Sequence, residues 1–425
     1  MMKTNWPPSL WAFSAQPAPD YLSLTDNIDV DVAVVGGGFT GLSTAIHLAK
    51  AGCSVAVLEA EEPGFGASGR NGGQVNPGWY INPEEILQAY GAKDGERVLD
   101  MVNGACDLVF ELIETYNIEC EAVRPGFIQA ARGEGGIALL QDRMRQWRAQ
   151  NVDMQFLDLA TTTKTIGTTA YRSATLDPRG GNLQPLSYAR GLARAALTEG
   201  VQIFKHCRVS AVEQSGGRWK LSNKNSSVLA SKIAFCTNGY TDKAWPGLKR
   251  TIIPVSSAIA ATEPLPEEIL QEILPSRHAV AETARVMNYF KLDANGRFLI
   301  GNRGPVYSAP DSDPAMPARK AAEEFFPILK KFKWDFGWGG YIALTPNRQP
   351  RLMQIANSVY AGMAYYGRGV AMATAMGKEL SLHMLDKDVH IPASSLQQIP
   401  LHEFHKLGIS SKFLSSKIMD KLQPI

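Results

Sequence analysis

The sequence predicts an α/β fold containing a Rossmann-type dinucleotide-binding domain, and three consecutive features near the N-terminus support this. The apolar, β-branched run Asp31–Val35 is typical of a buried strand. A Gly-X-Gly-X-X-Gly turn at residues 36–41 follows at once and opens Thr40–Lys50, whose apolar residues recur at helical intervals. A second strand, Ser54–Leu58, ends in Glu59, about 20 positions after the glycines. Together these features form a complete βαβ unit.

Each part of this unit has a physical role in holding a dinucleotide. Gly36 permits the tight turn, Gly38 lets the backbone approach a pyrophosphate, and Gly41 lets the helix pack against the strand. The free N–H groups at the helix N-terminus attract phosphate. Glu59 can accept hydrogen bonds from both ribose hydroxyls and would repel a 2′-phosphate, so NADP is not expected here. The alternative is a glycine-rich turn with no ligand.

A second glycine-rich segment, GFGASGRNGGQ, spans residues 64–74. Backbone N–H groups of such a loop can surround a flat polar ligand, and Arg70 adds a positive charge for phosphate. The alternative is a flexible surface loop. The chain shows no second strand-glycine-helix unit and no Cys-X-X-Cys, so a second dinucleotide site and a dithiol relay are not supported.

Beyond residue 80 the pattern predicts further elements in order. Residues 83–117 are mostly helical, residues 124–133 form a strand pair or hairpin edge, and residues 141–150 form another helix. An amphipathic helix at Ser187–Thr198 precedes a strand–turn–strand segment, and one helix, Pro317–Phe326, lies among short strands in residues 243–337.

The two glycine-rich segments resemble the D-amino acid oxidase superfamily of FAD-dependent amine oxidoreductases, and within it the bacterial γ-glutamylputrescine oxidases. Four more segments agree with that family in order: RGGNLQP at 179–185, FCTNGYTD at 235–242, WGGYIALTPNRQP at 338–350 and AYYGRGVAMATAMGKEL at 364–380. The resemblance implies bound FAD. The FAD-binding residues that it and the βαβ unit indicate are Gly36, Gly38, Phe39, Thr40, Gly41, Glu59, Ser68, Gly69, Arg70, Asn71, Gly72, Gly73, Gln74, Val209, Gly239, Thr345, Gly367, Arg368, Gly369 and Val370.

The segment before the last predicted helix suggests how the flavin ring is stabilised. Reduced flavin gathers negative charge, which the helix N-terminus and a nearby Arg368 would stabilise. Close relatives often carry histidine at this position, so Arg368 is a departure from the family pattern, and the alternative is that Arg368 points to solvent. Some relatives attach FAD through a cysteine or histidine, but residues 337–345 contain no cysteine and residues 67–71 no histidine, so we expect non-covalent FAD.

The resemblance also implies a split domain plan. Residues 1–28 are expected to form an N-terminal arm over the surface, and residues 29–82, 152–242 and 338–390 the Rossmann-type FAD-binding domain. Residues 83–151 and 243–337 would form an inserted α+β substrate domain with an antiparallel sheet. Residues 391–425 form a tail in which Ser411–Leu422 has one apolar helical face; we favour docking on its own protein over a membrane or partner contact.

The implied reaction is oxidation of the CH–NH bond of a small amine or amino acid, with a γ-glutamyl amine as the narrower candidate, to an imine that hydrolyses to an aldehyde or ketone. Electrons would pass to O₂, or in a dehydrogenase to a quinone or carrier, and a non-catalytic FAD-binding protein is a further alternative. No side chain is assigned as catalytic, because the flavin accepts the hydride. Tyr289, Arg303 and Tyr365 are candidates for substrate binding, Arg303 for a carboxylate. Other candidate pocket aromatics are Trp79, Tyr80, Phe290, Tyr307, Tyr341 and Tyr366.

Composition narrows the class of protein. The 425 residues suffice for two domains, and 43 basic against 41 acidic residues give a net charge of +2, which does not suggest nucleic-acid or anionic-membrane binding. The chain has no apolar run long enough to span a membrane and no recognisable signal peptide. Five scattered cysteines favour reduced thiols in a cytoplasm, and no histidine pattern supports a metal site.

Overall fold

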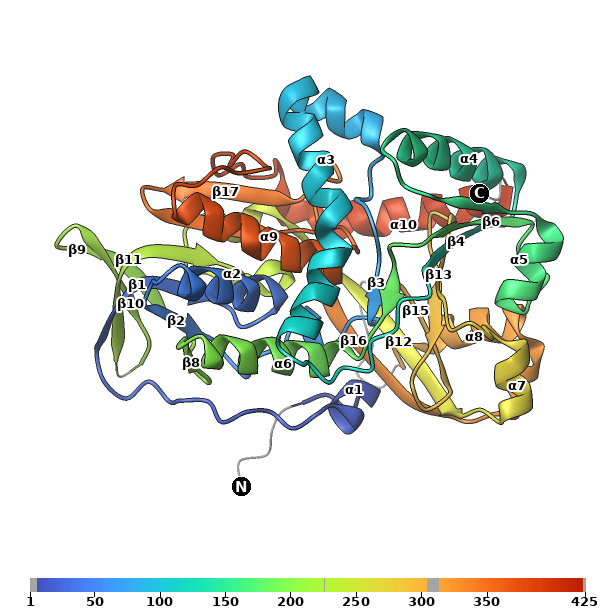
Figure 1. The fold of residues 1–425 in the computed structure, drawn as a ribbon, viewed down its shortest axis with the longest axis horizontal. Coiled ribbons are helices and arrows are strands. Elements are labelled where there is room, and N and C mark those ends of the chain that lie inside the picture. Colours follow the sequence, from blue (N-terminus) through green and yellow to red (C-terminus); the bar gives the residue numbers. More distant parts are fainter. Residues whose placement is uncertain (1–5, 225, 304–312, 423–425) are drawn as a thin grey trace.

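The computed structural model describes residues 6–224, 226–303 and 313–422. Two large sheets lie towards opposite ends of the long axis, and segments distant in sequence alternate between them (Figure 1). The architecture is therefore mixed α/β, as predicted.

The first sheet carries the dinucleotide unit. Its strand order is β17 (Arg351–Ala356), β18 (Val359–Met363), β11 (Ser227–Phe235), β1 (Ile28–Val35), β2 (Val55–Leu58) and β8 (Gln202–Phe204). Strands β18 to β8 are parallel, β17 is antiparallel, and the hairpin β9 (Ala211–Ser215) and β10 (Arg218–Ser222) extends from β11. Every residue of β2 is buried, as expected of a parallel strand covered on both faces.

One hydrophobic core beside this sheet includes residues of α2 (Phe39–Lys50), α3 (Pro83–Thr115), α6 (Pro185–Thr198) and α9 (Gly369–Met384) (Figure 1). Helices α2 and α9 lie very close, because a Cβ on Gly377 would stand 2.5 Å from the Thr40 carbonyl oxygen. This contact places the first turn of α2 beside the middle of α9, two helices from opposite ends of the chain.

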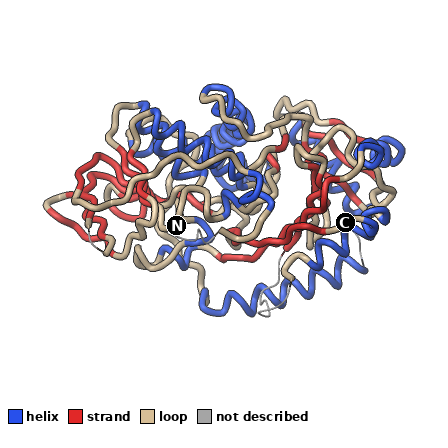
Figure 2. The backbone as a smooth tube through the Cα atoms, turned by 90° about the horizontal axis from the view of Figure 1, so that it is seen from below, coloured by secondary structure: helices blue, strands red, loops and turns tan. Residues whose placement is uncertain are grey.

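The second sheet is mostly antiparallel and curved (Figure 2). Its order is β16 (Trp334–Leu344), β12 (Ile253–Pro264), β15 (Arg297–Arg303), β14 (Tyr289–Leu292), β13 (Ala279–Glu282), β4 (Phe127–Ala131), β6 (Ser173–Asp177) and β5 (Gln155–Leu157), with only β13 and β4 parallel. The other helices of this part are α4 (Glu134–Ala149), α5 (Leu159–Ile166), α7 (Glu267–Glu272) and α8 (Met316–Phe325). Phe290, Phe298 and Phe325 pack in its core.

The remaining elements are two short strands and several 3₁₀ turns. Strands β3 (Gln74–Val75) and β7 (Gly181–Asn182) pair with each other. Single 3₁₀ turns are η1 (Ala67–Gly69), η2 (Asn238–Tyr240), η3 (Leu248–Thr251), η4 (Pro327–Lys331) and η5 (His402–Phe404).

Sheet membership corrects the predicted boundaries. Strands β5 and β6 belong to the second sheet, although residues 152–242 were assigned to the FAD-binding domain, and so does all of β16, which crosses the predicted boundary at residue 338. Conversely α3, assigned to the substrate domain, contributes Val98, Leu99 and Val102 to the core of the first sheet. Strand pairing and helix packing join residues far apart in sequence, which periodicity does not record.

The predicted helices agree with the structure better than the predicted domain boundaries do. The predicted helices over residues 83–117, 187–198 and 317–326 are confirmed as α3, α6 and α8. Residues 124–133 were predicted to form a strand pair or hairpin edge. They form the single strand β4, whose partners are β6 and β13, so a strand pair within this segment is wrong.

The N-terminal segment is more than a surface arm, and the C-terminal tail docks on its own protein as predicted. The N-terminal segment contains a short helix, α1 (Leu10–Ser14), and the Trp11 side chain is completely buried against the second sheet and α6. The tail forms α10 (His405–Leu422), which docks on the rest of the chain through Asp420 and Arg285. Among the described residues, no helix is both long and apolar enough to cross a membrane.

Candidate functional site

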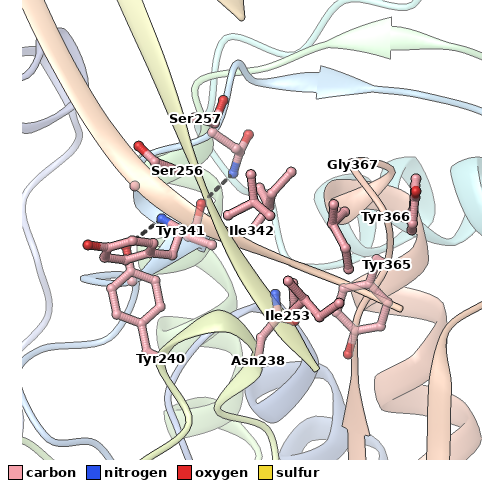
Figure 3. Close-up of a pocket in the computed structure, with 18 of the residues that line it drawn as sticks. Asn238, Tyr240, Ile253, Ser256, Ser257, Tyr341, Ile342, Tyr365, Tyr366 and Gly367 are labelled. Carbon is pink, nitrogen blue, oxygen red and sulfur yellow. Dashed lines mark hydrogen bonds between the residues drawn. The ribbon is translucent and has the colours of Figure 1, made fainter. Parts of the chain in front are cut away.

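A cavity of about 1100 Å³ lies between the two sheets. It exceeds the roughly 300–1,000 Å³ of typical small-molecule pockets, so it has room for a large ligand. Fifteen of the twenty predicted cofactor residues line it: Gly36, Gly38, Phe39, Thr40, Glu59, Ser68, Arg70, Asn71, Gly72, Gln74, Val209, Thr345, Gly367, Gly369 and Val370. Figure 3 shows the part formed by Tyr240, Tyr341 and the turn at Tyr365–Gly367.

The turn between β1 and α2 requires glycine at two positions. Gly36 has a φ of +105°, and a Cβ there would stand 2.9 Å from the Cys236 carbonyl oxygen. A Cβ on Gly41 would stand only 1.9 Å from the Gly36 carbonyl oxygen. Any side chain at Gly41 would therefore force α2 away from the turn, which explains why Gly41 supports the site without lining it.

The Glu59 carboxylate is held at the end of β2 by backbone donors. Its Oε2 accepts a hydrogen bond from Gly37 N at 2.6 Å, and its Oε1 accepts one from Glu61 N at 2.9 Å. Burial raises the pKa of the Glu59 carboxyl, whereas these two N–H groups lower it. Each oxygen keeps a second lone pair, so the carboxylate can still accept hydrogen bonds from a ribose.

The loop of residues 64–74 is ordered by its own side chains. The Ser68 hydroxyl accepts a hydrogen bond from Phe39 N at 3.0 Å, which joins the loop to the start of α2. Asn71 Oδ1 accepts one from Gly73 N, and Asn71 Nδ2 donates to the carbonyls of Ala67 and Ser68. The alternative of a flexible surface loop is therefore wrong.

Two indoles that the site prediction did not include hold the same loop. Trp11 Nε1 donates to the Asn71 carbonyl at 2.7 Å, and Trp338 Nε1 donates to the Arg70 carbonyl at 3.0 Å. The rings of Trp11 and Trp338 pack edge to face with centroids 5.8 Å apart. Two signals for this role were present in the sequence: a tryptophan in the proline-rich N-terminal segment, and Trp338 at the start of the WGGYIALTPNRQP segment.

The loop is also attached to the second sheet. Gln74 Nε2 donates to the carbonyls of Val280 and Phe290, and the buried Lys291 ammonium donates to those of Gly73 and Leu183. Burial lowers the pKa of Lys291 to about 7. The cofactor loop thus sits at a fixed position relative to the sheet that faces it.

Three predicted glycines support backbone packing rather than the cavity wall. Added Cβ atoms on Gly69, Gly73 and Gly239 would stand 2.4, 2.2 and 3.1 Å from the carbonyl oxygens of Gly64, Leu183 and Tyr341. These positions therefore hold neighbouring segments close without contacting a ligand directly.

The chain turns sharply between β18 and α9. Ala364, Tyr366 and Gly367 all have positive φ, and such backbone strain in non-glycine residues is typical of functional sites. Asn238 Oδ1 accepts a hydrogen bond from Ala364 N at 2.9 Å, and the hydroxyls of Tyr365 and Thr40 lie 2.6 Å apart. Burial raises the pKa of the Tyr365 hydroxyl well above its usual range, so it remains a neutral hydrogen-bonding group.

The Arg368 side chain does not reach the cavity, which corrects the expected contact between its guanidinium and a flavin. One guanidinium nitrogen donates to the Pro77 carbonyl at 3.0 Å, and the group lies over the Phe127 ring. It faces a separate small cavity that Arg143 and Trp147 also line. Burial lowers the pKa of Arg368 to about 10. The solvent alternative is wrong as well, because the guanidinium is packed inside the protein.

Several predicted aromatics gather at the cavity. Tyr80, Tyr289, Tyr341, Tyr365 and Tyr366 line it, and the rings of Tyr80 and Tyr366 lie 4.5 Å apart. The Tyr289 hydroxyl lies 3.0 Å from the Ser257 hydroxyl, and burial raises the pKa of Tyr289 to about 12.

The remaining candidates lie elsewhere. Trp79 and Phe290 pack in the hydrophobic cores, and Tyr307 lies outside the described residues. Arg303 is the last residue of β15 and its backbone pairs with Ser257, but its side chain is outside the description. Arg303 therefore stays a prediction.

The residues present fit FAD. Gly367 and Gly369 leave open space where a side chain would project, and among the described residues no side chain caps the N-terminus of α9. The free N–H groups of that helix could face a flavin ring, while those of α2 could face the pyrophosphate and Glu59 the ribose. One continuous cavity joins all three positions.

His402 and His405 interact with backbone carbonyls. Their ring nitrogens lie 2.8 Å from the Ile252 carbonyl and 2.7 Å from the His402 carbonyl. Within the described part of the chain, no three histidine, cysteine, aspartate or glutamate residues come together as a metal site would require.

Comparisons with known proteins agree with this geometry. The sequence pattern of the family described as FAD dependent oxidoreductase (DAO) matches residues 31–381. The chain is 32% identical over 374 residues to γ-glutamylputrescine oxidoreductase of Escherichia coli, covering 87% of each protein. It is 31% identical over 385 residues to the probable oxidoreductase OrdL of Haemophilus influenzae, covering 89% of this chain and 88% of that protein. Among solved structures, glycine oxidase from Geobacillus kaustophilus superposes with a TM-score of 0.72 at 20% identity, covering 86% of this chain and 97% of that one.

Proposed function

Because the chain belongs to the D-amino acid oxidase family of FAD-dependent oxidoreductases, we propose that it oxidises the terminal amine of a γ-glutamyl amine. The protein is an FAD-dependent enzyme acting on amines or amino acids, as its family membership shows. The finer substrate assignment rests on one observation, the 32% identity to γ-glutamylputrescine oxidoreductase across 87% of both chains.

When bound, FAD supplies the hydride acceptor for the carbon next to the substrate nitrogen. The substrate becomes an imine, which water hydrolyses to an aldehyde and ammonia. This chain's residues bind and orient the reactants. Glu59 and the N-terminus of α2 would hold the nucleotide half of the cofactor, and the N-terminus of α9 would stabilise negative charge on the flavin ring.

The aromatic wall supports the choice of an amine. Tyr80 and Tyr366 pack together at the cavity, and Tyr341 lies with Tyr240 on another side of it (Figure 3). Tyrosine faces attract an ammonium group by cation–π interaction, which aids capture of the amine before it loses its proton.

The unpaired cysteines support a cytoplasmic location. All five cysteines are free and four of them are buried, so no disulfide contributes to this fold. Such usage in a chain of 425 residues is typical of a reducing compartment.

An anaerobic flavin-bleaching panel tests the proposed substrate. The purified holoenzyme is mixed with amino acids, N-methyl amino acids, polyamines and γ-glutamyl amines, and loss of the oxidised flavin absorption is followed. We expect a γ-glutamyl amine to reduce the flavin faster than its free amine. Equal rates would remove the γ-glutamyl assignment, and a complete absence of bleaching would favour a non-catalytic FAD-binding protein. Comparing O₂ consumption with reduction of an artificial dye then identifies an oxidase or a dehydrogenase.

A further inference from the structure

Helix α10 bridges the two halves of the molecule and is fixed at both ends. Before its start, His402 bonds to the Ile252 carbonyl and Glu403 pairs with Arg250 at 3.1 Å. Near its end, the Asp420 carboxylate accepts hydrogen bonds from the backbone N–H groups of Arg285 and Val286 and from the Arg285 guanidinium. In Figure 2 this helix runs along the lower edge of the molecule, outside the curved strands, and ends near the C label.

One face of α10 forms part of the cavity wall. The residues of α10 that line the cavity are His405, Leu407, Gly408, Ile409, Lys412 and Ser416, and among them His405, Ile409, Lys412 and Ser416 recur three or four positions apart, as one side of a helix requires. Residues of the predicted cofactor site line the same cavity. The helix therefore forms part of the wall of the same cavity that the βαβ unit lines.

Lys412 differs from the other cations that line this cavity. Arg285 pairs with Asp420, and Arg348 pairs with Glu85 at 2.7 Å. Arg208 pairs with Asp242, and Arg70 donates to the Phe65 carbonyl. The Lys412 ammonium has no acceptor among the residues that the structure describes, and its exposed side chain lines the cavity. A cation placed in this way is suited to an anionic group of the ligand.

We propose that Lys412 determines specificity by binding the carboxylate at the end of the substrate opposite its reacting amine, with α10 forming one wall of the substrate site. This inference rests on the proposed function, because a γ-glutamyl amine carries an α-carboxylate at the end opposite its reacting amine. Lys412 acts on substrate affinity alone. The hydride leaves the other end of the molecule, against the aromatic wall.

The test compares two substrates in three proteins. The substrates are a γ-glutamyl amine and the same molecule without its α-carboxylate, and the proteins are wild type, Lys412→Gln and Lys406→Gln. Lys406 lies on the same helix but does not line the cavity, so it is the matched control. Anaerobic stopped-flow reduction gives the Kd and the limiting reduction rate separately.

We expect Lys412→Gln to raise the Kd of the carboxylate substrate roughly three- to tenfold, the range between an exposed ion pair and a charge-assisted hydrogen bond. The limiting rate and the Kd of the substrate without a carboxylate should not change, and Lys412→Arg should restore much of the affinity. Lys406→Gln should match wild type. A similar change for both substrates, or no change for either, would overturn the proposal.

A binding experiment separates this inference from the proposed function. Glutarate binding to the oxidised holoenzyme is read from perturbation of the flavin absorption spectrum, without turnover. Weaker binding to Lys412→Gln than to wild type and Lys406→Gln supports the carboxylate role even if no γ-glutamyl amine is oxidised. Equal binding, or none in any of the three proteins, overturns that role even if γ-glutamyl amines are good substrates.

Discussion

The hydroxyl of Thr40, in the first turn of α2, lies 2.6 Å from the hydroxyl of Tyr365, in the turn that leads into α9. Both side chains are buried and both line the cavity. The hydrogen bond therefore joins the two glycine-rich turns, 325 positions apart in sequence, so that the ends of α2 and α9 are positioned together.

A double-mutant cycle on this pair measures the coupling between the turns. Thr40→Val and Tyr365→Phe should each lower the free energy of unfolding, and the coupling energy should be about 0.5–1.5 kcal/mol, the net value of one buried hydrogen bond. Urea unfolding of the holoenzyme gives the change in free energy of unfolding, relative to wild type, for each single mutant and for the double mutant. As a control, Thr40→Val with Tyr360→Phe should be additive, because among the described residues the Tyr360 hydroxyl does not bond to Thr40. A coupling near zero for the first pair would contradict the joint positioning.

Glu59 should control the affinity for FAD. Glu59→Arg replaces an acceptor with a donor and removes two charge-assisted hydrogen bonds to the ribose, each worth roughly 1.5–3 kcal/mol. Titration of the apoprotein with FAD, followed by flavin fluorescence, should show a much higher Kd. Glu62→Arg is the control, since Glu62 bonds to Trp6 and does not line the cavity. FAD content that survives dialysis equally in both variants would show that Glu59 does not hold the ribose.

The flavin should be released completely by acid precipitation. Residues 67–71 contain no histidine and residues 337–345 no cysteine, the positions from which relatives form covalent links. The expected result is a colourless pellet and a yellow supernatant whose absorption accounts for all of the bound FAD. Flavin that remains with the denatured protein would refute non-covalent binding.

The buried Lys291 should make stability rise with pH. Burial lowers its pKa from 10.5 to about 7, so between these values the unfolded chain binds a proton that the folded protein has lost. Stability then increases with pH. The neutral amine keeps two N–H groups, enough for the carbonyls of Gly73 and Leu183.

Comparing wild type with Lys291→Met isolates this effect, because all other titrations are shared. Between pH 7 and about pH 9, the free energy of unfolding of wild type should rise relative to that of Lys291→Met by roughly 1–3 kcal/mol. Urea midpoints at several pH values provide the measurement. As a control, Lys220→Met, at an exposed position on β10, should show the same pH dependence of the free energy of unfolding as wild type. If Lys291→Met also showed the pH dependence of wild type, Lys291 would stay charged in the folded protein.

The βαβ unit could be predicted because its signals are local. The strand, the glycine turn and Glu59 lie within about 30 consecutive residues, and the unit packs against itself. The cofactor loop was likewise found from composition, since Asn71 holds it by hydrogen bonds within the loop.

Other features depended on packing between distant segments. Arg368 was placed next to the flavin because it follows Gly367, but its side chain turns towards Pro77 and Phe127. The buried position of Trp11 depends on a segment 60 residues away in sequence. Periodicity predicted a helix near the C-terminus, but only tertiary structure places Lys412 over the cavity.

The pH dependence of anaerobic flavin reduction tests the central claim, hydride transfer from a neutral amine, most directly. Only the neutral amine has the lone pair that stabilises the cationic imine as hydride leaves, so the reduction rate at subsaturating substrate should rise with pH and level off above an apparent ionisation. Replacing the hydrogens on the reacting carbon with deuterium should slow flavin reduction, which would show that the measured rate reports cleavage of the C–H bond. A rate that is independent of pH from about pH 6 to 10, with the isotope effect still present, would contradict the account.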